Sequence, residues 1–143
     1  MKEPLEPTVY SLPRRTDPRG NLSFLQSGDQ LPFEIARCYW LYDVPGDGSR
    51  DGHAFYTSKE VIIALSGSFD VVLDGGDGPR QRFHLNRSYN ALYIPPMYWR
   101  ELDNFSTNSV GMVVASTLYS ADDYIRDYEV FMQNARADKT PEE

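Results

Sequence analysis

Short hydrophobic stretches, some of them alternating with polar residues, follow one another along most of this chain. Turn-forming residues, chiefly Gly, Pro, Asp and Ser, separate these stretches. The stretches cover residues 9–12, 22–25, 33–42, 60–65, 69–73, 82–85, 91–94 and 110–115. Runs of this length between turn residues are typical of β-strands, and their spacing predicts an all-β sandwich or barrel.

Three connections between these stretches are predicted from their turn residues. Asp-Pro-Arg-Gly at 17–20 predicts a tight turn, and the glycine-rich segment 74–79 predicts a second. Ser-Gly-Ser at 66–68 is short enough for a β-hairpin between the stretches 60–65 and 69–73.

The stretch 33–42 carries large side chains on both of its faces. Tyr39 shares one face with Arg37, whereas Cys38 and Trp40 lie on the other. A strand of this kind is covered on both sides, as a strand at a subunit interface is. We therefore expect Cys38 to be buried.

Only residues 121–135 show helical periodicity, which predicts a short C-terminal helix. The hydrophobic positions Tyr124, Tyr128, Phe131 and Met132 recur at the spacing of one helix face. Most of the chain therefore belongs to the β-sheets, with the helix packed against them.

Composition narrows the class of protein. A chain of 143 residues is most simply one domain, here residues 1–136 followed by a polar tail, 137–143. The net charge of −7 argues against a nucleic-acid partner, because phosphate binding needs a basic surface. No run approaches the roughly 20 apolar residues of a membrane span, and no signal-peptide pattern is found. The single cysteine excludes an internal disulfide, and a cytoplasmic location is expected.

One motif in the middle of the chain contains candidate catalytic or metal-binding residues. His53 is followed by Phe55 at the second position after it, by Glu60, and then by Gly67. This pattern resembles the first sequence motif of the cupin family, in which a second histidine stands where this chain has Phe55. The resemblance implies an RmlC-like jelly-roll barrel or sandwich.

A more specific resemblance covers most of the chain. The fragments that carry it are residues 17–22, 31–39, 50–54, 92–99 and 123–128. In this order they resemble the WxcM-like nucleotide-sugar 3,4-ketoisomerases, which act on dTDP-4-keto-6-deoxyglucose in deoxysugar biosynthesis. The resemblance implies an isomerase without metal or other cofactor, a nucleotide-linked sugar as ligand, and a homodimer with an exchanged N-terminal strand. The chain departs from the family pattern at Phe55 and at Arg100, both usually histidine.

Moving a ketone from C4 to C3 of a sugar requires a base at C3, a proton donor near C4, and donors for the enediolate oxygen. An imidazole suits the first role at neutral pH, and His53 can still take one of the acid/base roles. Tyr39 and Glu60 are candidates for the second acid/base group, because Phe55 cannot transfer a proton.

Substrate contacts are expected from five further residues, Arg37, Arg50, Phe55, Trp99 and Arg100. Arginine suits a diphosphate, since its guanidinium forms two parallel hydrogen bonds. Plainer alternatives stay open for three of the candidates. Phe55 suits a barrel core, Glu60 suits a strand-end ion pair with an arginine, and Arg100 suits an ion pair with Asp103 or a neighbouring acid.

A metal site is not expected, because His53 and Glu60 supply only two ligands where zinc or iron usually takes three or more. Two other functions stay open beside the isomerase. One is a catalytically silent cupin that binds a nucleotide sugar as a sensor or partner subunit. The other is a sugar epimerase of related fold, which also needs a base and a proton donor.

Overall fold

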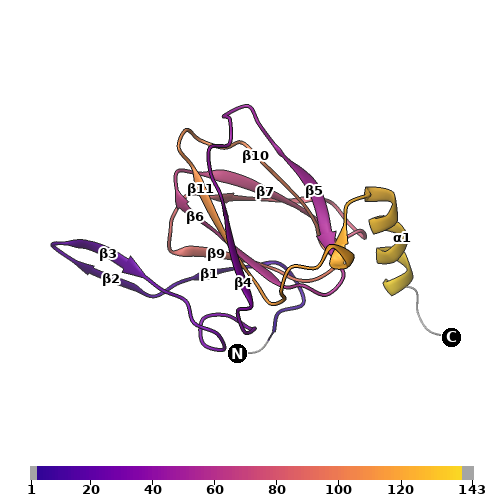
Figure 1. Ribbon diagram of the computed structural model, residues 1–143, viewed down its shortest axis with the longest axis horizontal. Helices are drawn as coiled ribbons and strands as arrows, with labels where there is room; N and C mark the ends of the chain where they lie inside the picture. Colours follow the sequence, from indigo (N-terminus) through magenta and orange to yellow (C-terminus); the bar gives the residue numbers. More distant parts are fainter. Residues whose placement is uncertain (1–2, 140–143) are drawn as a thin grey trace.

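Two five-stranded antiparallel sheets face each other in this protein (Figure 1). The computed structural model describes residues 3–139, except for the side chains of residues 50, 51 and 137–139. The first sheet has the order β1 (Thr8–Ser11), β9 (Asn90–Ile94), β6 (Glu60–Ser66), β11 (Val110–Ala115) and β4 (Arg37–Leu41). The second has the order β12 (Tyr124–Ile125), β5 (Arg50–Phe55), β10 (Trp99–Asp103), β7 (Phe69–Asp74) and β8 (Gln81–Leu85). The predicted all-β sandwich is confirmed.

A third, two-stranded sheet stands apart from the sandwich. It is the hairpin of β2 (Arg14–Asp17) and β3 (Gly20–Ser23), and it projects away from the rest of the molecule (Figure 1). Asp17 pairs with Gly20 across the predicted turn. Gly20 has a φ of 126°, a conformation that side chains disfavour and glycine permits.

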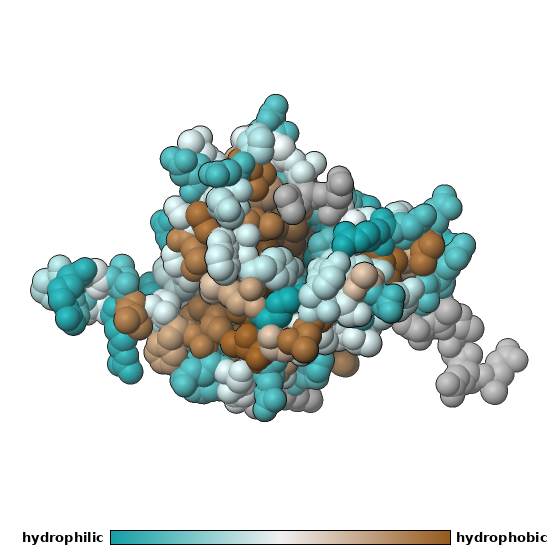
Figure 2. Space-filling model, in the orientation of Figure 1, coloured by the Kyte–Doolittle hydropathy of each residue, from teal (hydrophilic) through white to brown (hydrophobic). Residues whose placement is uncertain are grey.

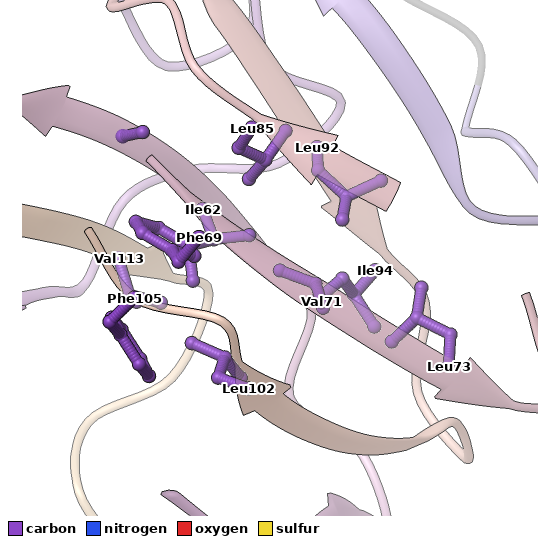
Figure 3. Close-up of a cluster of buried hydrophobic side chains, with 11 residues drawn as sticks. Ile62, Phe69, Val71, Leu73, Leu85, Leu92, Ile94, Leu102, Phe105 and Val113 are labelled. Carbon is purple, nitrogen blue, oxygen red and sulfur yellow. The ribbon is translucent and has the colours of Figure 1, made fainter. Parts of the chain in front are cut away.

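The main core lies between the two sheets (Figure 3). Alternate residues of each strand point into it, such as Ile62 of β6, and Val71 and Leu73 of β7. The outer face of the first sheet carries a second cluster, in which Leu31 and Phe33 cover part of the sheet.

Helix α1 (Tyr128–Lys139) covers part of the outer face of the second sheet. Phe131 and Ala135 of the helix pack against Trp99 and Ala54 of the strands. Within the described residues, no helix has the length and apolar character needed to cross a bilayer.

The predicted hairpin at 66–68 is wrong. β6 pairs with β9 and β11, whereas β7 pairs with β8 and β10, so the chain passes from one sheet to the other at this point. Gly67 makes the crossing with a φ of 66°. A Cβ there would be 3.0 Å from Cα of Ser109, so the crossing leaves no room for a side chain. Length alone does not distinguish a hairpin from such a crossover.

The predicted helix at 121–135 is wrong over its first part. Ala121–Asp123 form a 3-10 turn, and Tyr124 and Ile125 form β12, which pairs with β5. Asp123 accepts hydrogen bonds from the backbone amides of Thr57 and Ser58, so it ties this segment to the sheet.

The helix therefore begins at Tyr128. Asp127 caps it by accepting from the amides of Glu129 and Val130.

The prediction that Cys38 is buried is wrong, because Cys38 is exposed in the single chain. Strand β4 is at the edge of its sheet, and nothing in the described chain covers its outer face there.

Candidate active site

A cavity of about 530 Å³ opens into the sandwich. Its polar lining consists mainly of Tyr39, His53, Glu60, Arg100, Tyr124 and Arg126, and aliphatic side chains complete its wall. Figure 2 shows the surface hollowed between β4 and β5, with hydrophobic side chains visible at depth. A concave site with a few converging polar groups is the usual form of a small-molecule site.

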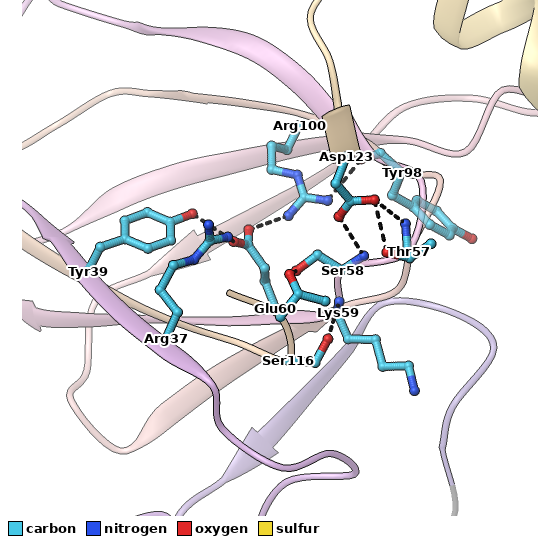
Figure 4. A network of polar contacts seen from close by, with 11 residues as sticks. Arg37, Tyr39, Thr57, Ser58, Lys59, Glu60, Tyr98, Arg100, Ser116 and Asp123 are labelled. Carbon is cyan, nitrogen blue, oxygen red and sulfur yellow. Dashed lines mark hydrogen bonds and ion pairs between the residues drawn. The ribbon is translucent and has the colours of Figure 1, made fainter. Parts of the chain in front are cut away.

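Glu60 is the charged centre of this cavity, although only 2% of it is exposed. Arg100 donates from Nη1 to Oε1 of Glu60 at 2.7 Å, and the Tyr39 hydroxyl donates to Oε2 at 2.8 Å (Figure 4). Nη2 of Arg37 lies 3.7 Å from the same Oε2. One carboxylate on β6 thus joins two arginines and a tyrosine from β4 and β10 and holds them in fixed positions.

The pairing of the strands explains this convergence. Ala115 of β11 is opposite both Arg37 of β4 and Glu60 of β6, so both side chains emerge on the same face of the first sheet. Arg100 is opposite His53 across β10 and β5, and these two share the inner face of the second sheet. The two inner faces meet at the cavity.

Burial governs the protonation of the two acidic groups. Burial raises the pKa of Glu60, and the positive charge of Arg100 opposes this shift. Burial also raises the pKa of Tyr39, and the negative charge of Glu60 raises it further. The Tyr39 hydroxyl therefore stays protonated and keeps its hydrogen bond to Glu60.

His53 lies among aromatic rings. Its ring centroid is 5.1 Å from that of Phe55, edge to face, and 5.4 Å from that of Tyr124. Phe55 is fully buried, with the guanidinium of Arg100 4.9 Å from its centroid. Phe55 therefore supports the groups that line the cavity and does not line it itself, which favours the plainer of its two interpretations.

The structure brings four sequence-predicted residues to the cavity wall, namely Tyr39, His53, Glu60 and Arg100. Arg37 contacts the wall through Glu60. Arg50 lies in β5, and its side chain is outside the described part of the structure. The alternative interpretation of Arg100, an ion pair with an acid, agrees with the structure. The acid is Glu60, whereas Asp103 pairs with Arg82.

Trp99 is corrected as a substrate contact. Strand alternation places Trp99 on the face opposite to Arg100, where its ring packs against Phe131 and Tyr128 of helix α1. Its Nε1 donates to Glu101 at 3.0 Å. Trp99 therefore holds the helix to the sheet.

Two cavity residues, Tyr124 and Arg126, were not among the predicted site residues. Their segment has a helical spacing of hydrophobic residues, which hid its role as a strand. The one available signal was the fragment 123–128, because it belongs to the resemblance described above. No group of three or more His, Cys, Asp or Glu side chains suited to a metal occurs among the described residues.

A comparison with protein families decides which family this is. The model described as "FdtA: WxcM-like, C-terminal" matches residues 6–136. The chain belongs to this family. A relative of this chain is TDP-4-oxo-6-deoxy-alpha-D-glucose-3,4-oxoisomerase of Aneurinibacillus thermoaerophilus. It is 35% identical over 127 residues, which are 89% of this chain and 91% of the relative.

Solved structures agree with that assignment. The TDP-quinovose 3,4-ketoisomerase WlaRB of Campylobacter jejuni superposes with a TM-score of 0.87 at 36% identity, over 91% of this chain and 99% of the other. QdtA, a sugar 3,4-ketoisomerase of Thermoanaerobacterium thermosaccharolyticum solved in complex with TDP, gives a TM-score of 0.91 at 29% identity. That match covers 95% of this chain and 98% of QdtA.

Proposed function

We propose that this protein is a sugar 3,4-ketoisomerase that moves the ketone of a TDP-linked 4-keto-6-deoxyhexose from C4 to C3. Such a step belongs to the biosynthesis of deoxysugars. The observation that carries the proposal is the meeting of His53, Tyr39 and the Glu60–Arg100 pair in one cavity. Membership in the FdtA family supports the reaction class, and QdtA in complex with TDP supports the nucleotide.

His53 is the base that removes the proton from C3. An imidazole is suited to this because its ordinary pKa lies near neutrality. As C3 loses its proton, the C4 ketone becomes an enediolate. The C4 oxygen then gains a proton as the C3 hydroxyl loses one, and a second proton returns to carbon C4. The product has a C3 ketone and a C4 hydroxyl, so two protons leave C3 and its oxygen and two arrive at C4 and its oxygen.

Tyr39 is the proton donor on the other side of the substrate. Its hydroxyl remains protonated because burial and Glu60 both raise its pKa. When the hydroxyl gives up its proton, Glu60 no longer receives that hydrogen bond, and the arginines on either side of Glu60 stabilise the extra negative charge. Arg100 supplies positive charge where the enediolate develops.

Phe55 takes no part in proton transfer. Its ring packs against His53, Tyr124 and Arg100, so it fixes the orientation of the groups around it. The chain thus uses one histidine and one tyrosine in the two acid/base roles of the reaction.

The test is turnover of TDP-4-keto-6-deoxyglucose in deuterated water, followed by NMR. We expect loss of the C3 proton signal and a 3-keto product carrying deuterium at C4. His53→Asn should lower the rate by about 10²–10⁴-fold, the effect of removing a positioned base. His84→Asn is the control, because His84 lies on the outer surface and should leave the rate within about twofold. A sugar that binds without any exchange would favour the silent binding protein.

We further propose that the protein is a homodimer in which the β2–β3 hairpin contacts a second copy. An isolated two-stranded hairpin is marginal in water, and in the described chain β2 and β3 pair only with each other. Leu22 in β3 is 58% exposed. The outer face of the first sheet leaves Trp40 and Leu65 exposed, 60% and 43% respectively, and a second cavity of about 420 Å³ lies where that face meets the hairpin.

A further inference from the structure

We propose that the aliphatic part of the cavity wall holds the C6 methyl group of the sugar and selects against a hydroxyl at C6. This inference rests on the proposed function and adds to it the residues that recognise a 6-deoxyhexose. The aliphatic wall is formed by side chains of both sheets, namely Leu41, Ile62, Ile94, Leu102 and Val113. Ile62, Leu102 and Val113 lie together between the two sheets (Figure 3).

The cavity has a polar part and an aliphatic part, and the alternation of side chains along the strands separates the two. Ile62 follows Glu60 by two residues on β6, so both point to the inner face of the first sheet. Leu102 follows Arg100 by two residues on β10 in the same way. The Glu60–Arg100 pair thus marks the polar part, and the hydrocarbon surface begins roughly 7 Å further along each strand.

Val113 places the aliphatic wall beside the proposed proton donor. It is opposite Tyr39 across β11 and β4, and opposite Ile62 across β11 and β6. Residues directly opposite each other on one face have Cβ atoms about 5 Å apart. In a hexose, C5 is bonded to C4 and carries C6. A sugar whose C4 receives a proton from Tyr39 therefore has its C6 group at Val113 and Ile62.

A methyl group suits this wall and a hydroxymethyl group does not. Ile62, Leu102 and Val113 are 3%, 6% and 4% exposed, and their side chains contain neither a donor nor an acceptor. A methyl group against them leaves water without losing a hydrogen bond, and its burial favours binding. A hydroxyl in the same place loses its hydrogen bonds to water and gains none from these side chains.

The experiment is isothermal titration of TDP-6-deoxyglucose, TDP-glucose and TDP into the full-length protein and its Val113→Thr variant. The two sugars differ only by the oxygen on C6. We expect the unmodified protein to bind TDP-6-deoxyglucose about 10–100-fold more tightly than TDP-glucose, the effect of a buried hydroxyl without a partner. Val113→Thr keeps the shape of the side chain and adds a hydroxyl beside C6. The ratio should then fall to about threefold or less, with the affinity for TDP unchanged.

The matched control is Val72→Thr. Val72 points to the outer face of the second sheet, because its neighbours Val71 and Leu73 point into the core. We expect its ratio of affinities to equal that of the unmodified protein. A second variant, Leu41→Asn, tests the same wall should Val113→Thr fail to fold, since Leu41 is only half-buried on the edge strand β4. Its amide should also lower the ratio.

Failure of the methyl subsite and failure of the proposed function give different results. An unmodified protein that isomerises the keto sugar but binds the two TDP-sugars equally removes the subsite alone. So does a ratio that stays unchanged in Val113→Thr and Leu41→Asn. An unmodified protein that prefers TDP-6-deoxyglucose but exchanges no proton of the keto sugar removes the isomerase proposal alone. If neither TDP-sugar binds at millimolar concentration, the subsite is also wrong.

Discussion

At the scale of single residues, the site depends on how one buried carboxylate is compensated. Glu60 has a guanidinium and a phenol within hydrogen-bonding distance and a second guanidinium at 3.7 Å. Such a group is costly to bury alone, and the same is true of Arg100, which is 3% exposed. The two residues therefore depend on each other for stability as well as for charge.

Replacing Glu60 by Gln should destabilise the protein by roughly 3–5 kcal/mol, because Arg100 would stay buried without a counter-charge. Urea denaturation at neutral pH measures this free energy of unfolding. The control is Glu101→Gln. In the unmodified protein Glu101 forms an ion pair with Arg80, and the two side chains are 40% and 43% exposed. That change should cost about 1 kcal/mol or less. Equal losses in the two variants would contradict the role given to Glu60.

A second carboxylate, that of Asp70 on the outer face of the second sheet, should make the free energy of unfolding depend on pH in the acid range. Burial by itself would raise the pKa of Asp70, but hydrogen bonds from His84, Arg82 and Asn104 lower it below the ordinary value of 3.8. The stability that Asp70 contributes is therefore present above pH 3.8 and is lost as the pH falls through the lowered pKa.

Asp70→Asn tests this dependence. Its free energy of unfolding should change less between pH 6 and about pH 3 than that of the unmodified protein, because no carboxylate is left to protonate at this position. Urea denaturation midpoints measured across that range give the comparison. Parallel curves for the two proteins would show that the hydrogen bonds to Asp70 do not lower its pKa.

At the scale of elements, the position of His53 depends on how closely β5 packs against β10. The residue before it is Gly52, and a Cβ there would lie 2.5 Å from Cε2 of the Trp99 indole. Trp99 cannot move away easily, because helix α1 packs over it. The glycine thus lets the indole lie over the strand that carries the proposed base.

Gly52→Ala should therefore lower both stability and activity. Overpacking of this kind costs about 1–3 kcal/mol, and a shift of about 1 Å in a neighbouring catalytic group costs about 10²-fold in rate. The measurements are urea denaturation and kcat for the keto sugar. Gly78→Ala is the control, because a Cβ there meets nothing within 4 Å. A normal kcat in Gly52→Ala would show that β5 adjusts without displacing His53.

At the scale of the whole molecule, the single chain leaves part of one sheet face uncovered and one hairpin paired with no other strand within the described residues. Trp40 and Leu65 are exposed on that face, and the hairpin projects beside it (Figure 1). In a dimer formed through this face, the hairpin of each copy packs against the sheet of the other. The exposed sheet face and the hairpin are then both covered.

Leu65→Lys should convert the proposed dimer into a monomer, because it places a charge in the middle of the shared face. Light scattering coupled to size-exclusion chromatography measures the mass directly. Val130→Lys is the control, because Val130 is 38% exposed on α1, which covers the other sheet. An unmodified protein that runs as a monomer at micromolar concentration would overturn the dimer.

The sequence alone determined most of the strands, the turn at 17–20 and the family. These depend on neighbouring residues, because alternation of hydrophobic side chains and turn chemistry act within a few positions. The predicted strands omitted β2, β5 and β10, which carry charged or small residues in place of a hydrophobic run.

Only the tertiary structure decided which strands share a sheet and what each side chain meets. The crossing at Gly67, the placing of Trp99 under the helix, and the pairing of Glu60 with Arg100 all join residues through contacts between sheets or across them. Tyr124 and Arg126 reached the cavity because β12 pairs with β5, although their spacing suits a helix. Burial against distant strands outweighs local propensity, and a sequence does not state which distant strand that is.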